Sequence, residues 1–281
     1  MKVINGRCLG RDLYFENYVN YDEFLRTVLD RDENNNHDSE YKLKETIGSK
    51  SWSGVSSVDE AKELLMNGWN KEIETLKKTF NSDFKTMQSR QVNKRFNDVV
   101  GFMPIVPNAI IGLPISMINT RKEVKKQKVL RFLVDATKAC RYDYDEIVEK
   151  MSKILAVIAN FEKSGYRCKI EILETFSQPD ERKTIIGFSI PVKNETQLFD
   201  IKRLAFPIIH SAMSRVFGFS WQASLPLEYK KTSSKNLGKS LCYWGESKRN
   251  EVLNSIQKGN EKMIYVSMET DIDELLKEVK E

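Results

Sequence analysis

The chain has 281 residues, of which 40% are hydrophobic and 30% are charged. This composition excludes a wholly disordered chain and a fibrous repeat, and the length suits one large domain or two smaller ones. The formal net charge of +5 is too small to indicate a nucleic-acid-binding protein by itself.

The charge is distributed unevenly along the chain. Residues 1–45 carry seven Lys or Arg and ten Asp or Glu, a balance of −3, and residues 261–281 carry three and seven, a balance of −4. Since the total is +5, residues 46–260 carry +12. A basic middle is compatible with an acidic partner or a polyanion, although a solvated surface is the favoured explanation.

Two helices are predicted in the first part of the chain, and a third one after them. Apolar residues at helical spacing over 9–29 predict the first helix. Ser57 and Glu60 form a capping box for the second, and Gly68 stands where a left-handed cap would end it. The third is expected over residues 70–81.

An apolar segment over residues 99–118 contains no charge and is long enough to cross a bilayer as a helix. Pro104, Pro107 and Pro114 interrupt it, and prolines remove backbone donors and break a regular helix. We therefore predict a buried, extended, turn-rich segment, with a membrane-associated loop as the alternative. The N-terminus has no apolar signal-peptide core, so a cytoplasmic protein without a membrane partner is expected.

Strands and helices alternate after residue 128. The patterns predict strands over 129–137, 168–177, 183–192 and 262–268, and helices over 142–164, 196–217 (kinked at Pro207) and from the possible cap Asp271 onward. Five polar residues between the second and third of these strands indicate an antiparallel hairpin at the sheet edge. The expected fold class is α/β, with a mostly parallel sheet and helices on both faces.

Two domains are expected. Residues 1–120 would form a mainly helical N-terminal region that includes the Pro-rich apolar segment, and residues 121–281 would form the α/β domain. The boundary falls at the basic run RKEVKKQKVLR, residues 121–131.

The order of elements after residue 128 resembles a von Willebrand factor A-like domain. In that family the first strand ends in Asp-x-Ser-x-Ser, whose oxygens hold a divalent metal. Asp135 and Thr137 match the first Asp and the first hydroxyl, but Ala139 replaces the third ligand and Lys138 adds a cation. Such a site is poor for Mg²⁺, so the resemblance implies a lost metal site and no cofactor.

Three segments resemble an uncharacterised bacteriophage and mobile-element family. They are SWSGVSSVDEAKELLMNGW (51–69), the Pro-rich apolar segment, and ILAVIANFEKSGYRCKIEI (154–172). This resemblance implies a phage-like origin and no particular reaction.

Catalytic signatures are absent from the sequence. It contains no GxxxxGK[ST] phosphate-binding loop, no GxGxxG after a strand and no GxSxG elbow. The only histidines are His37 and His210, and Cys8, Cys140, Cys168 and Cys242 form no CxxC pair, so no zinc signature exists. An enzyme is therefore not expected, although the converging carboxylates of a metal nuclease leave no local signature.

Three functions follow from these patterns. The first is a non-enzymatic protein-interaction or assembly module of phage type, whose Asp135, Thr137 and Lys138 lie on the rim at the strand ends and contact a protein partner. The second is a nucleic-acid-binding replication or packaging accessory, in which cations lie near the aromatic residues Tyr229 and Trp244. These cations are Arg121, Lys122, Lys125, Lys126, Lys128, Lys230, Lys231 and Lys235. The third is a virion structural component. The expected location is the cytoplasm, that of the host for a phage protein, or the virion.

Overall fold

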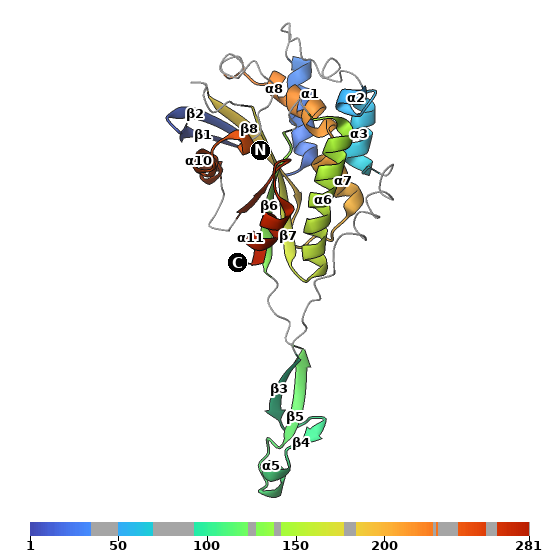
Figure 1. The fold of residues 1–281 in the computed structure, drawn as a ribbon, viewed down its shortest axis with the longest axis vertical. Helices are drawn as coiled ribbons and strands as arrows, with labels where there is room; N and C mark the ends of the chain where they lie inside the picture. Colours follow the sequence, from blue (N-terminus) through green and yellow to red (C-terminus); the bar gives the residue numbers. More distant parts are fainter. Residues whose placement is uncertain are drawn as a thin grey trace.

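A computed structural model of the chain describes residues 1–34, 50–69, 93–122, 128–137, 142–176, 184–226, 229, 241–256 and 263–280. These residues form two sheets. One has six strands and lies in the body of the molecule, and the other has three strands and lies in a projecting arm (Figure 1).

The six-stranded sheet has the order β1-β2-β8-β7-β6-β9. Its strands are β1 (Lys2–Cys8), β2 (Arg11–Asn17), β6 (Val129–Asp135), β7 (Arg167–Thr175), β8 (Ile185–Lys193) and β9 (Met263–Val266). The pairs β2–β8, β6–β7 and β6–β9 are parallel, and β1–β2 and β7–β8 are antiparallel. The predicted α/β class and the antiparallel pairing of β7 with β8 are confirmed. The expectation that β8 lies at the sheet edge is wrong, because β2 and β1 continue the sheet beyond it.

The mainly helical region expected over residues 1–120 is not confirmed, because β1 and β2 belong to the same sheet as the C-terminal strands. A turn with positive φ at Leu9 (55°) and Gly10 (71°) joins these two strands. Mirror-image turns of this kind match the twist of a hairpin. The expected boundary at residues 120/121 therefore does not separate helices from the sheet.

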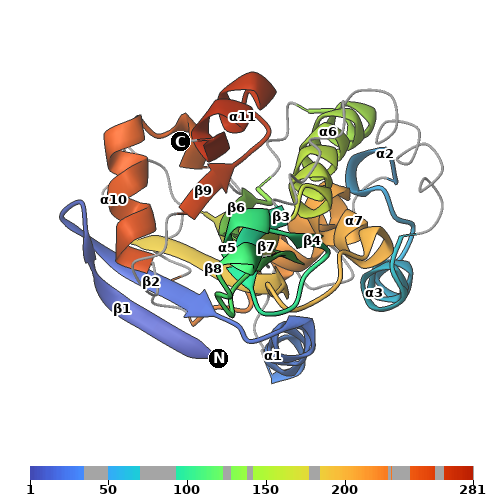
Figure 2. The same ribbon diagram turned by 90° about the horizontal axis from the view of Figure 1, so that it is seen from below.

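Helices cover both faces of the six-stranded sheet (Figure 2). The larger core, on one face, includes side chains from α1 (Tyr21–Asn34), α3 (Val58–Asn67), α6 (Tyr144–Lys163), α7 (Ile201–Ile209), α8 (Phe219–Ala223) and α11 (Ile272–Lys280). The short helix α2 (Lys50–Ser53) contacts α6. The smaller core, on the other face, includes residues of α10 (Glu246–Ile256) and of the 3₁₀ turn Leu241–Tyr243.

The predicted helix over 196–217 is interrupted. Helix α7 ends at Ile209, two residues after Pro207, and a π-helical segment follows at Met213–Gly218. Pro207 cannot donate a backbone hydrogen bond, and the backbone N–H of Ala212 donates to Nδ1 of His210 at 3.1 Å. The helical ladder is therefore broken at this point.

The N-caps predicted at Ser57 and Asp271 are formed, whereas the left-handed cap predicted at Gly68 is not. The backbone N–H of Glu60 donates to the Ser57 hydroxyl at 3.0 Å, and the Glu60 carboxylate accepts from the backbone N–H of Ser56 rather than that of Ser57. Asp271 caps α11 by accepting from the backbone N–H of Asp273 at 2.7 Å. Gly68 has φ +84° and ψ 159°, a positive φ outside the left-handed helical region. The helix predicted over 70–81 lies outside the described residues.

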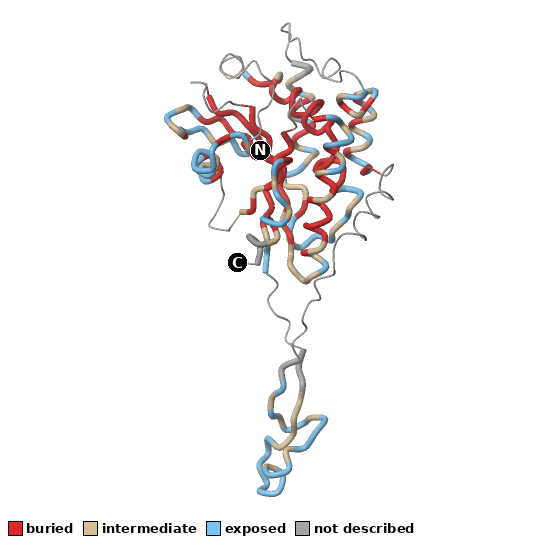
Figure 3. Tube along the Cα trace, in the orientation of Figure 1, coloured by how far each residue is buried: buried red, intermediate tan, exposed pale blue. Residues whose placement is uncertain are grey.

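The arm consists of β3 (Asn93–Asp98), β4 (Met103–Pro104), α5 (Val106–Ile110) and β5 (Met117–Lys122), with the strand order β3-β5-β4. The prediction that residues 99–118 are buried is wrong: Val100, Ile110 and Ile111 are 73%, 78% and 70% exposed. The strands of the arm pair with one another, and Figure 3 colours most residues of the arm as exposed or intermediate. No helix among the described residues is both long and apolar enough to cross a bilayer.

Candidate functional site: a crevice along the edge strand β9

The site lies where the chain changes from one face of the sheet to the other. Strand β6 leads into α6, which packs in the larger core, whereas α10 packs in the smaller core on the opposite face before the chain enters β9. Strands β6 and β9 are neighbours and parallel, so their carboxyl ends meet at one edge. In open α/β sheets this switch point is where ligands bind.

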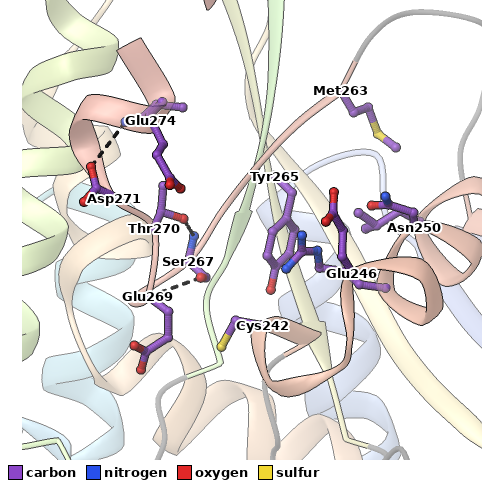
Figure 4. A pocket seen from close by; sticks show the side chains of 13 residues that line it. Cys242, Glu246, Asn250, Met263, Tyr265, Ser267, Glu269, Thr270, Asp271 and Glu274 are labelled. Atoms are coloured by element: carbon purple, nitrogen blue, oxygen red, sulfur yellow. Dashed lines mark hydrogen bonds between the residues drawn. The ribbon is translucent and has the colours of Figure 1, made fainter. Parts of the chain in front are cut away.

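A crevice of about 550 Å³ extends from the carboxyl end of β9 along this edge strand to its first residue, Met263. Its walls are Met263 and Tyr265 of β9, the residues that directly follow β9, the first turn of α11, one side of α10 and Cys242 (Figure 4). Because β9 is at the edge of the sheet, the crevice opens between α10 and α11. Sequence reasoning missed it because α10 was not predicted.

Four carboxylates and one guanidinium line the crevice: Glu246, Glu269, Asp271, Glu274 and Arg249. Two of the carboxylates hold the fold together. Glu269 accepts hydrogen bonds from the hydroxyls of Tyr142 and Tyr243, and Asp271 caps α11. Glu246 and Glu274 are exposed and lie in the first turns of α10 and α11, where a negative charge also complements the helix dipole.

Tyr265 joins the crevice to the end of β6. Its ring lies 5.2 Å from the Arg249 guanidinium, measured to the ring centroid, and its hydroxyl donates to Oδ2 of Asp135. The backbone N–H of Leu241 donates to the same Asp135 oxygen at 3.1 Å, and that of Thr137 donates to Oδ1 at 2.9 Å. The Asp135 carboxylate therefore fixes three segments that surround the site.

The predicted interaction rim is not formed as expected. Asp135 and Thr137 are only 1% and 3% exposed, so these side chains cannot contact a partner directly. The reason is that donors from β9 and the 3₁₀ turn close over the end of β6. Lys138 lies outside the described residues.

No group of three or more His, Cys, Asp or Glu side chains suitable for a metal occurs among the described residues. Protein donors occupy both Asp135 oxygens, which leaves this carboxylate poorly suited to bind a cation. The loss of the metal site stays a prediction.

The residues of the nucleic-acid alternative are only partly described. Arg121 and Lys122 belong to β5 in the arm, and Lys128 is exposed before β6. Lys125, Lys126, Lys230, Lys231 and Lys235 lie outside the described residues. Trp244 is only 2% exposed, and Tyr229 stacks on Tyr14 at 4.0 Å between ring centroids. The Trp244 ring is therefore not on the surface, and nucleic-acid binding stays a prediction.

A second crevice, of about 240 Å³, is bordered by His210, Trp69, Tyr144 and Gly54. Burial lowers the pKa of His210 to about 4, so the imidazole is neutral at pH 7. Its ring packs between those of Trp69, Tyr144 and Phe206. His210 is therefore a buried, packed side chain.

The fold and the crevice define a mixed α/β protein with its candidate ligand site at the strand ends. The chain belongs to a family described as a domain of unknown function, DUF7192, which matches residues 4–279. No curated protein and no solved structure matches the chain.

Proposed function

We propose that this protein is a non-enzymatic interaction or assembly module that binds a basic segment of a protein partner in the crevice between α10 and α11. The observation that carries the proposal is the position of this acidic crevice at the switch point of the sheet. The proposed partner segment is basic because four carboxylates line the crevice against one guanidinium.

We further propose that this module is a metal-free von Willebrand factor A-like unit of phage origin. The consecutive strands β8-β7-β6-β9, with β8 antiparallel to β7, support the resemblance. The involvement of the Asp135 carboxylate in internal hydrogen bonds supports the absence of a metal.

The test is selection of peptide ligands from a random library on the immobilised full chain, followed by affinity measurements at two salt concentrations. We expect basic, extended peptides whose affinity falls with salt. The double change Glu246→Lys and Glu274→Lys should weaken binding by about tenfold or more, because both carboxylates are exposed in the crevice.

Glu63→Lys is the matched control, because Glu63 is an exposed glutamate on α3, away from the crevice. This variant should bind the selected peptides as the unchanged protein does. Selection of no peptide, or equal weakening by Glu63→Lys, would contradict the proposal.

A further inference from the structure

The tip of the arm exposes large apolar side chains from three consecutive segments: the β3–β4 connection with β4, α5, and the α5–β5 connection. In Figure 3 most of the arm is coloured as exposed or intermediate. The exposed residues are Val99, Val100, Phe102, Met103, Val106, Ile110, Ile111, Leu113 and Ile115. Residues 99–120 contain no charged side chain. A contiguous exposed apolar surface of this kind marks an interaction site for another molecule or a membrane.

Several backbone N–H groups of the tip donate to backbone carbonyl oxygens within the arm. The backbone N–H of Phe102 donates to the backbone carbonyl oxygen of Ile118 at 3.0 Å. In the same way, Ile105 donates to the carbonyl of Ser116 at 2.7 Å, and Leu113 donates to that of Asn108 at 2.9 Å. Pro104, Pro107 and Pro114 have no N–H to satisfy. An unpaired backbone donor is costly in an apolar medium. Because these donors are paired or absent, the tip can move from water into an apolar medium at a lower cost.

Basic residues lie at the base of the arm, between the apolar tip and the body of the molecule. The strand register pairs Lys94 with Arg121, Arg95 with Thr120, and Asn93 with Lys122, and Arg95 is exposed. One acidic residue, Asp98, lies on β3 between these basic residues and the apolar tip. Its carboxylate accepts hydrogen bonds within the arm from the backbone N–H of Val99 and the side chain of Asn119.

We propose that the arm inserts its tip into one leaflet of an anionic lipid bilayer, with its basic base against the headgroups. The tip of the arm is uncharged and apolar, and its base is basic. This order matches the apolar interior and the anionic headgroup layer of such a bilayer. The apolar residues come from three segments rather than from one helix face, which favours a surrounding medium over a flat partner. Insertion into one leaflet needs no membrane-spanning helix, and this site is separate from the crevice of the proposed function.

The experiment is vesicle flotation with the purified full chain, using vesicles of phosphatidylcholine alone or mixed with phosphatidylglycerol. We expect binding to the anionic vesicles that weakens with salt, and weaker binding to phosphatidylcholine alone. The double change Ile110→Asp and Ile111→Asp should reduce binding by about tenfold or more, because two inserted side chains become charged.

Leu198→Asp is the matched control, because Leu198 is 86% exposed but lies in the body. This variant should bind the vesicles as the unchanged protein does. Arg95→Gln should lower affinity for anionic vesicles about fivefold at low salt and leave binding to phosphatidylcholine nearly unchanged. In a Phe102→Trp variant, tryptophan emission should shift to the blue when anionic vesicles are added.

Three results would overturn the inference. The first is no binding of the unchanged protein to anionic vesicles at low salt. The second is equal binding by the variant with Ile110→Asp and Ile111→Asp. The third is self-association without lipid that this double change abolishes, because a second copy of the chain would then cover the tip.

Discussion

At the scale of single residues, a buried network of charged and polar side chains surrounds Glu16. Its carboxylate is fully buried and accepts from the Arg31 guanidinium at 2.7 and 3.2 Å, from Trp221 Nε1 at 2.7 Å, and from the hydroxyls of Tyr14 and Tyr18. Burial acts to raise the pKa of Glu16, but the hydrogen bonds from Arg31 and the tyrosines outweigh it and hold this pKa below its usual value.

Replacing Glu16 should destabilise the fold strongly. Glu16→Gln leaves the partly buried charge of Arg31 without its partner, and we expect a loss of about 3 kcal/mol in the free energy of unfolding. Urea denaturation measures this loss. Glu149→Gln, which removes an exposed ion pair with Lys153, serves as the control and should change stability little. Similar losses in the two variants would contradict the prediction.

His210 should make the fold sensitive to acid. Its pKa is about 4 in the folded protein because burial disfavours the charged imidazole, whereas an unfolded histidine titrates near about 6.5. The unfolded state therefore binds more protons between these values, and stability falls as the pH drops through this window.

The His210 contribution is lost progressively from about pH 6.5 to 4 and amounts to at most about 3 kcal/mol. Denaturant unfolding at a series of pH values measures the slope. A His210→Gln variant should show a shallower slope in this window than the unchanged protein, whatever its absolute stability. Identical slopes would show that His210 does not titrate as proposed.

At the scale of secondary-structure elements, the π-helical segment Met213–Gly218 packs directly on β7. The Ser214 hydroxyl donates to the buried Glu174 carboxylate, and a Cβ added at Gly218 would overlap that carboxylate. The close approach explains why a glycine stands at the end of this segment, although its φ of −63° is ordinary.

Gly218→Ala should therefore destabilise the fold by about 2 kcal/mol, because the buried Glu174 side chain has to move away from its partner. Gly245→Ala is the control: it precedes α10, and a Cβ there meets nothing within 4 Å. Thermal unfolding of both variants compares the two sites. An unchanged melting temperature for Gly218→Ala would contradict this packing.

The end of β6 gives a prediction about metals. Both Asp135 oxygens accept hydrogen bonds from protein donors, so Mg²⁺ or Ca²⁺ at millimolar concentration should leave the melting temperature of the protein unchanged. Asp135→Asn should instead lower stability by about 1 to 3 kcal/mol, because a donor amide replaces one of the accepting oxygens. A clear rise in the melting temperature with either cation would show that the protein binds that cation, and it would contradict the prediction.

At the scale of the whole molecule, the arm and the body have separate sheets. Within the described part of the chain, the sheet of the arm pairs β3, β4 and β5 only with one another. Replacing residues 93–122 by a short Gly/Ser linker should therefore leave the body folded, with a melting temperature within about 5 °C of that of the full chain. Circular dichroism on heating measures this change. Loss of cooperative unfolding in the shortened chain would show that the body depends on the arm.

Local sequence patterns determined most of the C-terminal elements. The predicted β6, β7, β8 and β9 and helices α6 and α11 are present, because apolar periodicity and capping residues act over a few neighbouring positions. The hairpin pairing of β7 with β8 was predictable for the same reason, since five polar residues separate the two predicted strands.

Only the tertiary structure decided the contacts between distant segments. It placed β2 beside β8, closed β9 and the 3₁₀ turn over Asp135, and so buried the predicted rim. It also left the apolar residues 99–118 in an exposed arm, although their composition is that of a core. Burial depends on whether a second layer covers a segment, and no local pattern encodes that layer.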